Sequence, residues 1–367
     1  MINSLNLLRF FSQNNINFFS GVPDSVLKEF TNKLDNLKKI KHYICVNEGS
    51  AVSLNIGNYL ATKQIGVTYL QNSGLGHIIN PIVSIADSKV YNIPLVLLIG
   101  WRGAPGSNDE AQHLKQGSIT KKILKTMGIK YLELSHNKQI PSLKKIITFS
   151  KNKKKIIAIL IKRNKFEKEN KSKVKIKKNN NLSKKFFFEN LLNIIKKNTK
   201  IISSTGYISR ELFNVRKNIK YKNSKDLYLV GGMGHTSSVG LGYSLKTKND
   251  LLCIDGDGSS LMHLGSLFTS SYFAKKNFKY FLLNNYCHDS VGGQKTYSDM
   301  LNYEKLASSF KFRRYYLINQ RENLKIKLKR ILKQNGPLFI EIKINHENSN
   351  LSRPKDFKKI YKNFIDE

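Results

Sequence analysis

The 367-residue chain carries 63 lysines and arginines against 25 aspartates and glutamates, so its formal net charge is +38. With 40% hydrophobic and 10% aromatic residues it has the composition of a folded protein, and its length predicts two domains or one large one. Its three cysteines are too few for a disulfide framework and fit a reducing compartment. The longest apolar runs fall far short of the roughly 20 residues that cross a bilayer, so we expect a cytoplasmic protein with no membrane partner.

The positive charge is spread along the whole chain together with an excess of asparagine and isoleucine. This distribution indicates compositional drift at exposed positions, whereas a nucleic-acid groove requires a localised basic patch with interleaved aromatic residues. We therefore expect no nucleic-acid partner. A basic nucleic-acid-binding protein on an inactive enzyme fold is the alternative from a different class. A positive field also favours an anionic small substrate.

The first part of the chain alternates short apolar segments with segments of helical spacing, the pattern of strand–helix–strand units around a parallel sheet. The apolar run over 93–99 contains no charged residue and is typical of a strand buried on both faces of a sheet. We expect strands over 42–46, 66–70, 93–99 and 156–161, and helices over 48–61 and 76–88.

A stretch of lysine and asparagine with no apolar period follows over 163–185 and predicts an interdomain linker. The alternation then resumes. We expect strands over 200–203, 227–230, 251–255, 280–284 and 337–344, and helices over 209–216, 234–245 and 260–274. The predicted fold class is α/β, with two doubly wound parallel-sheet domains over 1–162 and 186–367.

Two motifs end neighbouring predicted strands of the second domain. Gly256-Asp257-Gly258 follows one strand and Asn284-Asn285 ends the next, with 25 residues between the motifs. The carboxyl ends of parallel strands meet at one edge of a sheet, where ligands bind. A carboxylate and an amide oxygen there suit Mg²⁺, glycines allow close approach of a diphosphate, and a helix beginning near Ser259 favours an anion.

This arrangement resembles the thiamine-diphosphate (ThDP) signature of the ThDP-dependent decarboxylases. The resemblance implies that Asp257 and Asn285 ligate Mg²⁺ and that the backbone carbonyl of Cys287 adds a third oxygen. It also implies a role for Glu48, which follows a first-domain strand in Val46-Asn47-Glu48-Gly49. The matching glutamate of the family bonds N1′ of the cofactor's aminopyrimidine and promotes its activation, whereas the residues alone favour a simple helix cap.

Further motifs resemble the phosphonopyruvate decarboxylases and their close relatives, the sulfopyruvate decarboxylases. The motifs are GVPDS (21–25), QNSGLGH (71–77), GWRGAPG (100–106), DEAQHLKQG (109–117), GGMGH (231–235) and HDSVGGQ (288–294). Ala104, Ala111 and Lys295 depart from the pattern expected within these motifs. The resemblance covers nearly the whole chain except the linker and the C-terminal tail, and the middle domain of larger ThDP decarboxylases is missing.

The resemblance implies a ThDP- and Mg²⁺-dependent enzyme that converts 3-phosphonopyruvate to phosphonoacetaldehyde and CO₂ in phosphonate biosynthesis. A sulfopyruvate decarboxylase giving sulfoacetaldehyde is the alternative. In such enzymes the active site lies between subunits, so we expect a homo-oligomer, at least a dimer.

The candidate site residues follow from these motifs. Arg102 suits a phosphonate because its planar donors bind two oxygens at once, although a surface cation is the plain alternative. The resemblance implies that Met233 is the bulky apolar residue that supports the bent conformation of the cofactor. An isolated methionine more often fills a hydrophobic core. The catalytic candidates are Glu48, Asp24 and His288. The cofactor candidates are Glu48, Gly232, Met233, Gly256, Asp257, Gly258, Ser259, Asn285 and Cys287, and the substrate candidates are Asp24, Ser25, His77, Arg102 and His113.

Overall fold

The computed structural model describes the chain apart from residues 35–36, 38–39, 169–181, 219–224, 347–350 and 366–367. It divides into two compact units. Unit 1 comprises Met1–Lys173 with Val291–Gln294, and unit 2 comprises Val174–Ser290 with Lys295–Glu367. The greater part of the predicted linker, 169–181, lies outside the described residues. Before it, Phe166 is buried in unit 1 and pairs with Ile2.

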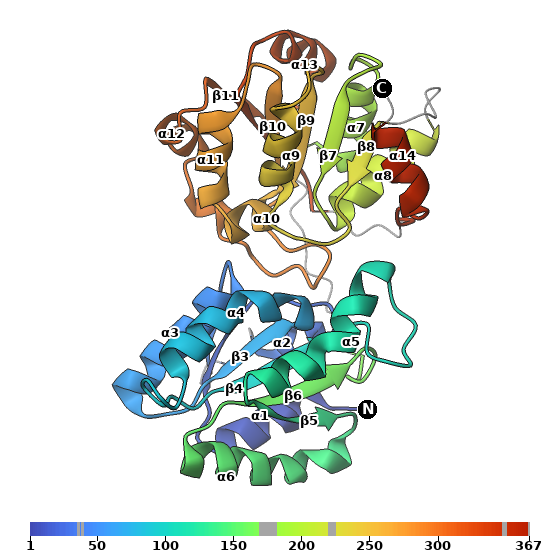
Figure 1. Ribbon diagram of the computed structural model, residues 1–367. Coiled ribbons are helices and arrows are strands. Elements are labelled where there is room, and N and C mark those ends of the chain that lie inside the picture. Colours follow the sequence, from blue (N-terminus) through green and yellow to red (C-terminus); the bar gives the residue numbers. More distant parts are fainter. Residues whose placement is uncertain (35–36, 38–39, 169–181, 219–224, 347–350, 366–367) are drawn as a thin grey trace. The chain divides into compact units, whose positions relative to one another are not determined.

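Unit 1 is built on a six-stranded parallel sheet with the order β2-β1-β3-β4-β6-β5 (Figure 1). Its strands are β1 (Phe18–Gly21), β2 (Lys41–Ile44), β3 (Val67–Gln71), β4 (Val96–Trp101), β5 (Lys130–Leu134) and β6 (Ile157–Lys162). Its α-helices are α1 (Ser4–Gln13), α2 (Lys28–Leu34), α3 (Glu48–Thr62), α4 (Leu75–Pro81), α5 (Ala111–Thr126) and α6 (Leu143–Lys153).

Side-chain alternation along the strands divides the core of unit 1 between the two faces of its sheet. On β4, Val96 and Leu98 belong to one cluster together with residues of α1, α2 and α6. Leu97 and Ile99 belong to another cluster with residues of α3, α4 and α5. Both faces are thus covered by helices, as a parallel sheet requires.

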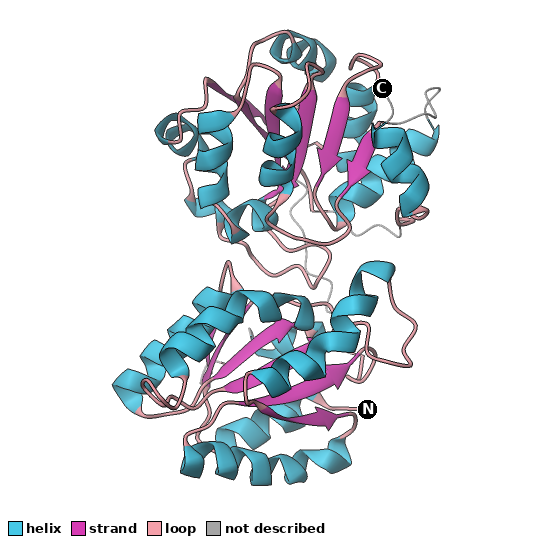
Figure 2. Cartoon of the chain, viewed as in Figure 1, coloured by secondary structure: helices cyan, strands magenta, loops and turns pink. Residues whose placement is uncertain are grey.

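Unit 2 repeats this plan with the strand order β11-β12-β10-β9-β7-β8, again wholly parallel. Figure 2 shows helices flanking its strands. Its strands are β7 (Lys200–Ser203), β8 (Asp226–Tyr228), β9 (Leu251–Gly256), β10 (Phe278–Asn284), β11 (Arg314–Ile318) and β12 (Leu338–Lys343). Its α-helices are α7 (Lys184–Leu192), α8 (Tyr207–Asn218), α9 (Thr236–Ser244), α10 (Asp257–Met262), α11 (Gly265–Phe273), α12 (Tyr303–Ser309), α13 (Leu324–Leu332) and α14 (Phe357–Ile365).

The predicted fold class, two parallel-sheet α/β units, is confirmed. Two predicted helices differ in detail. The one expected over 76–88 is α-helical only to Pro81 and continues as a wider π-helical turn over Ile82–Ala86, because proline lacks the N–H that an α-helix interior uses. The one expected over 260–274 consists of α10 and α11, since His263 leaves the helical conformation at φ −134°, ψ 54°.

The strands β1, β5 and β11 were not predicted. β5 and β11 are edge strands with exposed charged residues, so they lack the continuous apolar run that marks a central strand. Within the described part of the chain, no helix combines the length and apolar character that crossing a bilayer demands.

Candidate active site

A polar pocket lies in unit 2 at the carboxyl edge of its sheet. Gly256 at the end of β9 pairs in register with Leu283 of β10, so the two loops that follow these strands are neighbours. The pocket is lined by residues of both loops, by the loop after β7 and by Met233. Among its lining residues are Gly256, Asp257, Gly258, Ser259, Asn285, Cys287 and His288, all of them predicted from the sequence.

Asp257 is buried at the base of this pocket, with 2% of its surface exposed. Its Oδ2 accepts hydrogen bonds from the hydroxyls of Thr296 and Ser298, the latter at 2.9 Å. Burial penalises the charged carboxylate and raises the pKa of Asp257 to about 6. No cationic side chain of the described residues forms an ion pair with Asp257, and a buried carboxylate of this kind is suited to a metal ion.

The two asparagines of the second motif have different surroundings. Asn284 is fully buried in the sheet, where its Nδ2 donates to Oε1 of Glu341 at 2.9 Å. Asn285 lines the pocket, and its Oδ1 accepts from the N–H of Cys287 at 3.3 Å. Asp257, Asn285 and Cys287 thus all line one pocket, and these residues carry a carboxylate, a side-chain amide oxygen and a backbone carbonyl. This all-oxygen donor set fits Mg²⁺.

The sulfur of Cys287 lies beside Asp289 and His346, with Nδ1 of His346 at 3.2 Å. Burial and the neighbouring carboxylate of Asp289 raise the pKa of its thiol far above the ordinary value. Its Sγ donates to Oδ1 of Asp289 at 3.0 Å. Burial and this carboxylate therefore favour the protonated thiol.

Glycines allow close packing of the backbone around the pocket. Gly258 has His288 so close that a Cβ there would lie 2.6 Å from the imidazole. Gly232 adopts φ +64°, in the left-handed region that favours glycine, directly before Met233. The hydroxyl of Ser259 accepts from the N–H of Gly234 at 2.9 Å, which joins the Met233 loop to the first motif.

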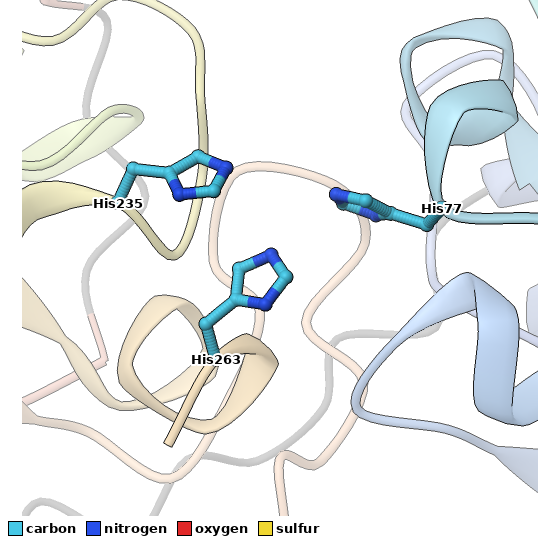
Figure 3. A group of neighbouring side chains, drawn as sticks. All are labelled: His77, His235 and His263. Atoms are coloured by element: carbon cyan, nitrogen blue, oxygen red, sulfur yellow. The ribbon is translucent and has the colours of Figure 1, made fainter. Parts of the chain in front are cut away.

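Two histidines pack together beside the Met233 loop. The rings of His235 and His263 stack with centroids 4.7 Å apart (Figure 3). The backbone at Gly234 approaches His263 so closely that a Cβ would lie 2.4 Å from the ring. The third side chain in Figure 3, His77, comes from α4 of unit 1.

A buried ion pair holds the loop after β10. Lys184 at the beginning of α7 is 1% exposed, and its Nζ donates to Oδ2 of Asp289 at 2.8 Å. His346 contacts the other oxygen of the same carboxylate through Nδ1. The neighbouring His288 lines the pocket, and burial lowers its pKa to about 4. His288 is therefore a neutral imidazole at neutral pH.

In unit 1, α3 begins at Glu48, which is 5% exposed, and packs against Gly74. A Cβ at Gly74 would lie 2.4 Å from Oε1 of Glu48, so only glycine accommodates the carboxylate there. The other oxygen, Oε2, lies 2.6 Å from Nδ1 of His77. This hydrogen bond raises the pKa of His77 above its ordinary value.

A second cluster in unit 1 brings together Asp24, Ser25 and Arg102. Arg102 binds the carboxylate of Asp109 through two nitrogens, at 2.8 and 2.5 Å, and donates to the hydroxyl of Ser25 at 3.0 Å. Asp24 is 1% exposed, and its Oδ2 accepts from the N–H groups of Val26 and Leu27.

The other oxygen of Asp24, Oδ1, is buried and has no hydrogen-bond partner among the described residues. Burial raises the pKa of this carboxyl to about 6, although the charge of Arg102 opposes the shift. His113 contributes its backbone carbonyl beside Gly103, next to Arg102. Of the predicted substrate residues, Asp24, Ser25 and Arg102 therefore share one site, and His113 borders it through its backbone.

Four residues that position these groups were not predicted from the sequence. They are Asp109, Lys184, Thr296 and Ser298. Asp109 lies in one of the recognised motifs, seven residues after Arg102. This short separation could have indicated an ion pair between the two residues. Lys184 fell within the predicted linker, and nothing in its sequence context distinguished it from the surrounding exposed lysines.

Two family models match the chain, in the same order as its two units. The model of the thiamine pyrophosphate enzyme N-terminal TPP binding domain matches residues 5–124, and that of the C-terminal TPP binding domain matches residues 204–342. Together they span well over half of the chain. The chain belongs to the thiamine pyrophosphate enzyme family, and thiamine pyrophosphate is another name for the predicted ThDP. The resemblance stated from the motifs is confirmed.

Individual relatives are more specific. A phosphonopyruvate decarboxylase of Streptomyces viridochromogenes is 27% identical over 92% of this chain and 87% of its own length. One of Streptomyces hygroscopicus is 27% identical over 97% of this chain and 91% of its own length. A sulfopyruvate decarboxylase subunit beta of Methanothermobacter thermautotrophicus is 32% identical over 46% of this chain and 85% of its own length.

Proposed function

We propose that the chain is a ThDP- and Mg²⁺-dependent decarboxylase that converts 3-phosphonopyruvate to phosphonoacetaldehyde and CO₂, as a step of phosphonate biosynthesis. The carbon–carbon bond to the carboxylate breaks, CO₂ leaves, and one proton is taken up at the former carbonyl carbon. The observation that carries this proposal is the convergence of Asp257, Asn285 and Cys287 on one pocket in a chain of this family. The two relatives that span nearly all of the chain support the substrate.

Mg²⁺ would be held by the carboxylate of Asp257, the side-chain oxygen of Asn285 and the backbone carbonyl of Cys287. The main chain at Gly256 and Gly258, which line the pocket, would lie beside the diphosphate, and Met233, in the loop shaped by Gly232, would support the cofactor's rings. When bound, ThDP supplies an electron sink that lets CO₂ leave without a free acyl anion.

The chain's own residues control the protons. Nδ1 of His77 lies 2.6 Å from Oε2 of Glu48 and fixes the orientation of the carboxyl group that would transfer a proton. Asp24 has a pKa of about 6 and a buried oxygen without a partner among the described residues, so it is able to bind and release a proton near neutral pH. His288 is neutral and serves as a hydrogen-bonding group of the pocket.

Arg102 retains its charge because desolvation is outweighed by the carboxylates around it. We propose that it contributes to recognition of the substrate's anionic end together with the hydroxyl of Ser25. A sulfonate carries a smaller charge than a phosphonate dianion, and both are bound by such a group. Sulfopyruvate therefore stays the second candidate substrate, supported by the sulfopyruvate decarboxylase relative.

The experiment that tests the function is aldehyde formation from phosphonopyruvate and from sulfopyruvate in parallel, with ThDP and Mg²⁺ present or withheld. We expect cofactor-dependent turnover of phosphonopyruvate. Preference for sulfopyruvate would transfer the assignment to the second candidate. Absence of turnover with either substrate, although ThDP binds, would contradict the decarboxylase proposal.

Two variants separate cofactor binding from chemistry. Glu48→Gln should reduce kcat by about 10²–10⁴-fold, the usual range for loss of a proton-transfer group, and leave ThDP bound. Asp257→Ala should weaken binding of Mg²⁺ and ThDP together, as measured by calorimetry. Glu322→Gln, at an exposed position of unit 2, is the control for both. The predicted homo-oligomer is tested by sedimentation of the same preparations.

A further inference from the structure

A second cavity lies in unit 2, at the amino edge of the sheet and so at the opposite end of the strands from the pocket described above. Thr199, Asp250 and Asn277, which immediately precede β7, β9 and β10, line it, and the end of α13 forms one wall. Its volume is about 580 Å³. Ligand pockets commonly span roughly 300–1,000 Å³, so a nucleotide-sized molecule fits.

The cavity is strongly basic. Six of its fifteen lining residues are lysines: Lys196, Lys248, Lys276, Lys279, Lys329 and Lys333. In the whole chain 63 of 367 residues are lysine or arginine, so the lining is enriched about twofold in cations beyond the general excess. Compositional drift alone does not explain this local density.

One carboxylate balances part of the charge. Lys279 is 2% exposed, and its Nζ lies 3.0 Å from Oδ1 of Asp250. Lys196 lies 3.7 Å from Oδ2 of the same residue. Within the described residues, no carboxylate lies within ion-pair distance of Lys248, Lys276, Lys329 or Lys333. Four ammonium groups at the cavity therefore lack a counter-charge from that part of the chain.

The cavity also offers apolar and hydrogen-bonding surface. Ile194, Ile195, Leu252 and Leu332 line it alongside the lysines. Asn277 is buried, and its Nδ2 donates to the carbonyls of Thr247 and Asn249, at 3.1 and 3.0 Å. Its Oδ1 is buried and has no partner in the described structure, so an acceptor is available for a ligand hydroxyl or amine.

We propose that this cavity binds a small phosphorylated organic molecule of the size of a nucleoside diphosphate. Its phosphates would be held by the lysines at the cavity, its ring or alkyl part by the four aliphatic side chains, and a hydroxyl or amine by Asn277. Lysine is suited to phosphate as a compact point charge. The cavity is a hollow of about 580 Å³ with apolar side chains beside the lysines, which favours a small ligand over a nucleic-acid strand.

The test uses ADP, inorganic pyrophosphate and adenosine as probes, with binding measured by calorimetry. The protein is first saturated with ThDP and Mg²⁺ and freed of excess by gel filtration, so that the active-site pocket is not available. We expect ADP to bind more tightly than either pyrophosphate or adenosine. The double variant Lys329→Gln/Lys333→Gln should weaken ADP binding at least tenfold. Lys325→Gln/Lys327→Gln, on the same helix α13 but outside the cavity lining, should change it less than twofold.

Three results would overturn the proposal. The first is absence of ADP binding at millimolar concentration. The second is an equal loss in both double variants, which would indicate surface charge alone. The third is displacement of ADP by a short DNA duplex that binds more tightly, which would assign the surface to nucleic acid. Because the readout is binding and not turnover, the result is independent of the proposed decarboxylase activity.

Discussion

Oε2 of Glu48 and Nδ1 of His77 lie 2.6 Å apart, between the beginning of α3 and the middle of α4. The carboxylate is 7% exposed and the imidazole 27% exposed, so solvent screens this pair only in part. The acid that the family resemblance marks as catalytic is therefore oriented by a histidine of the same unit. His77 is a positioning residue in this arrangement.

The contact between Glu48 and His77 predicts how the pKa of His77 responds to substitution of Glu48. Glu48→Gln should lower the pKa of His77 toward its ordinary value, because the hydrogen bond to Glu48 is what raises it. NMR titration of the histidine rings measures the shift. Glu322→Gln should leave the titration unchanged, and an unaltered pKa of His77 in the Glu48 variant would contradict the pairing.

The raised pKa of His77 also predicts how the stability of the fold depends on pH. The folded pKa of His77 is raised, so the pair stabilises the fold fully below the unfolded pKa of about 6.5 and loses this contribution as the pH rises through the folded pKa. The stability advantage of the wild type over Glu48→Gln should therefore decrease as the pH rises above about 6.5.

Asp109→Asn tests the buried ion pair between Asp109 and Arg102. The Arg102 side chain is 8% exposed and the Asp109 side chain is 2% exposed. Leaving Arg102 unpaired should reduce the free energy of unfolding by about 2–4 kcal/mol at pH 7. The pKa of Asp109 is held well below its usual range by Arg102 and by the N–H of Gly103. The contribution is thus present above the unfolded pKa of about 3.9 and is lost as the pH falls through the folded value.

Urea unfolding at several pH values measures this effect. Glu133→Gln, in the partly exposed pairs with Lys121 and Lys162, is the matched control and should cost less than about 1 kcal/mol. Equal costs for the two variants would show that burial of the Arg102 pair adds nothing.

Thr296→Val tests the support of the metal ligand. The hydroxyl of Thr296 contacts Oδ2 of Asp257, and both residues are buried. Loss of a group that orients a metal ligand typically costs about 10–100-fold in affinity, so we expect at least tenfold weaker Mg²⁺-dependent ThDP binding by calorimetry. Thr269→Val, on the exposed side of α11, should bind like the wild type. Unchanged affinity in Thr296→Val would remove Thr296 from the site.

Lys184→Met tests the anchor of the loop after β10. The variant leaves Asp289 buried without its ammonium partner, which should cost about 3–5 kcal/mol in the free energy of unfolding. The adjacent Lys185 is 65% exposed and forms only a long contact with Glu189, so Lys185→Met should cost less than about 0.5 kcal/mol. Thermal and urea unfolding of the two variants compare them directly, and similar losses would contradict the anchoring role.

Much of the architecture was predictable because it depends on local pattern. The apolar runs at Val96–Trp101 and Ile157–Lys162 form central strands, as their lack of polar interruption indicates. The strands Lys130–Leu134 and Arg314–Ile318, which contain exposed charged residues, were not predicted. A strand at the edge of a sheet does not require a continuous apolar run. Lys184 was assigned to the linker by composition, yet it is buried, since its environment depends on a carboxylate 105 residues later.

The sequence alone determined which residues stand at the carboxyl ends of the strands. Parallel strands align their ends, so the spacing of Asp257 and Asn285 was sufficient to predict two neighbouring loops. The tertiary structure alone decided which partner each side chain has. It pairs Arg102 with Asp109, gives Asp257 to Thr296 and Ser298, and places Lys184 against Asp289. These pairings depend on where separate loops meet and which way each side chain points, and neither is encoded in local periodicity.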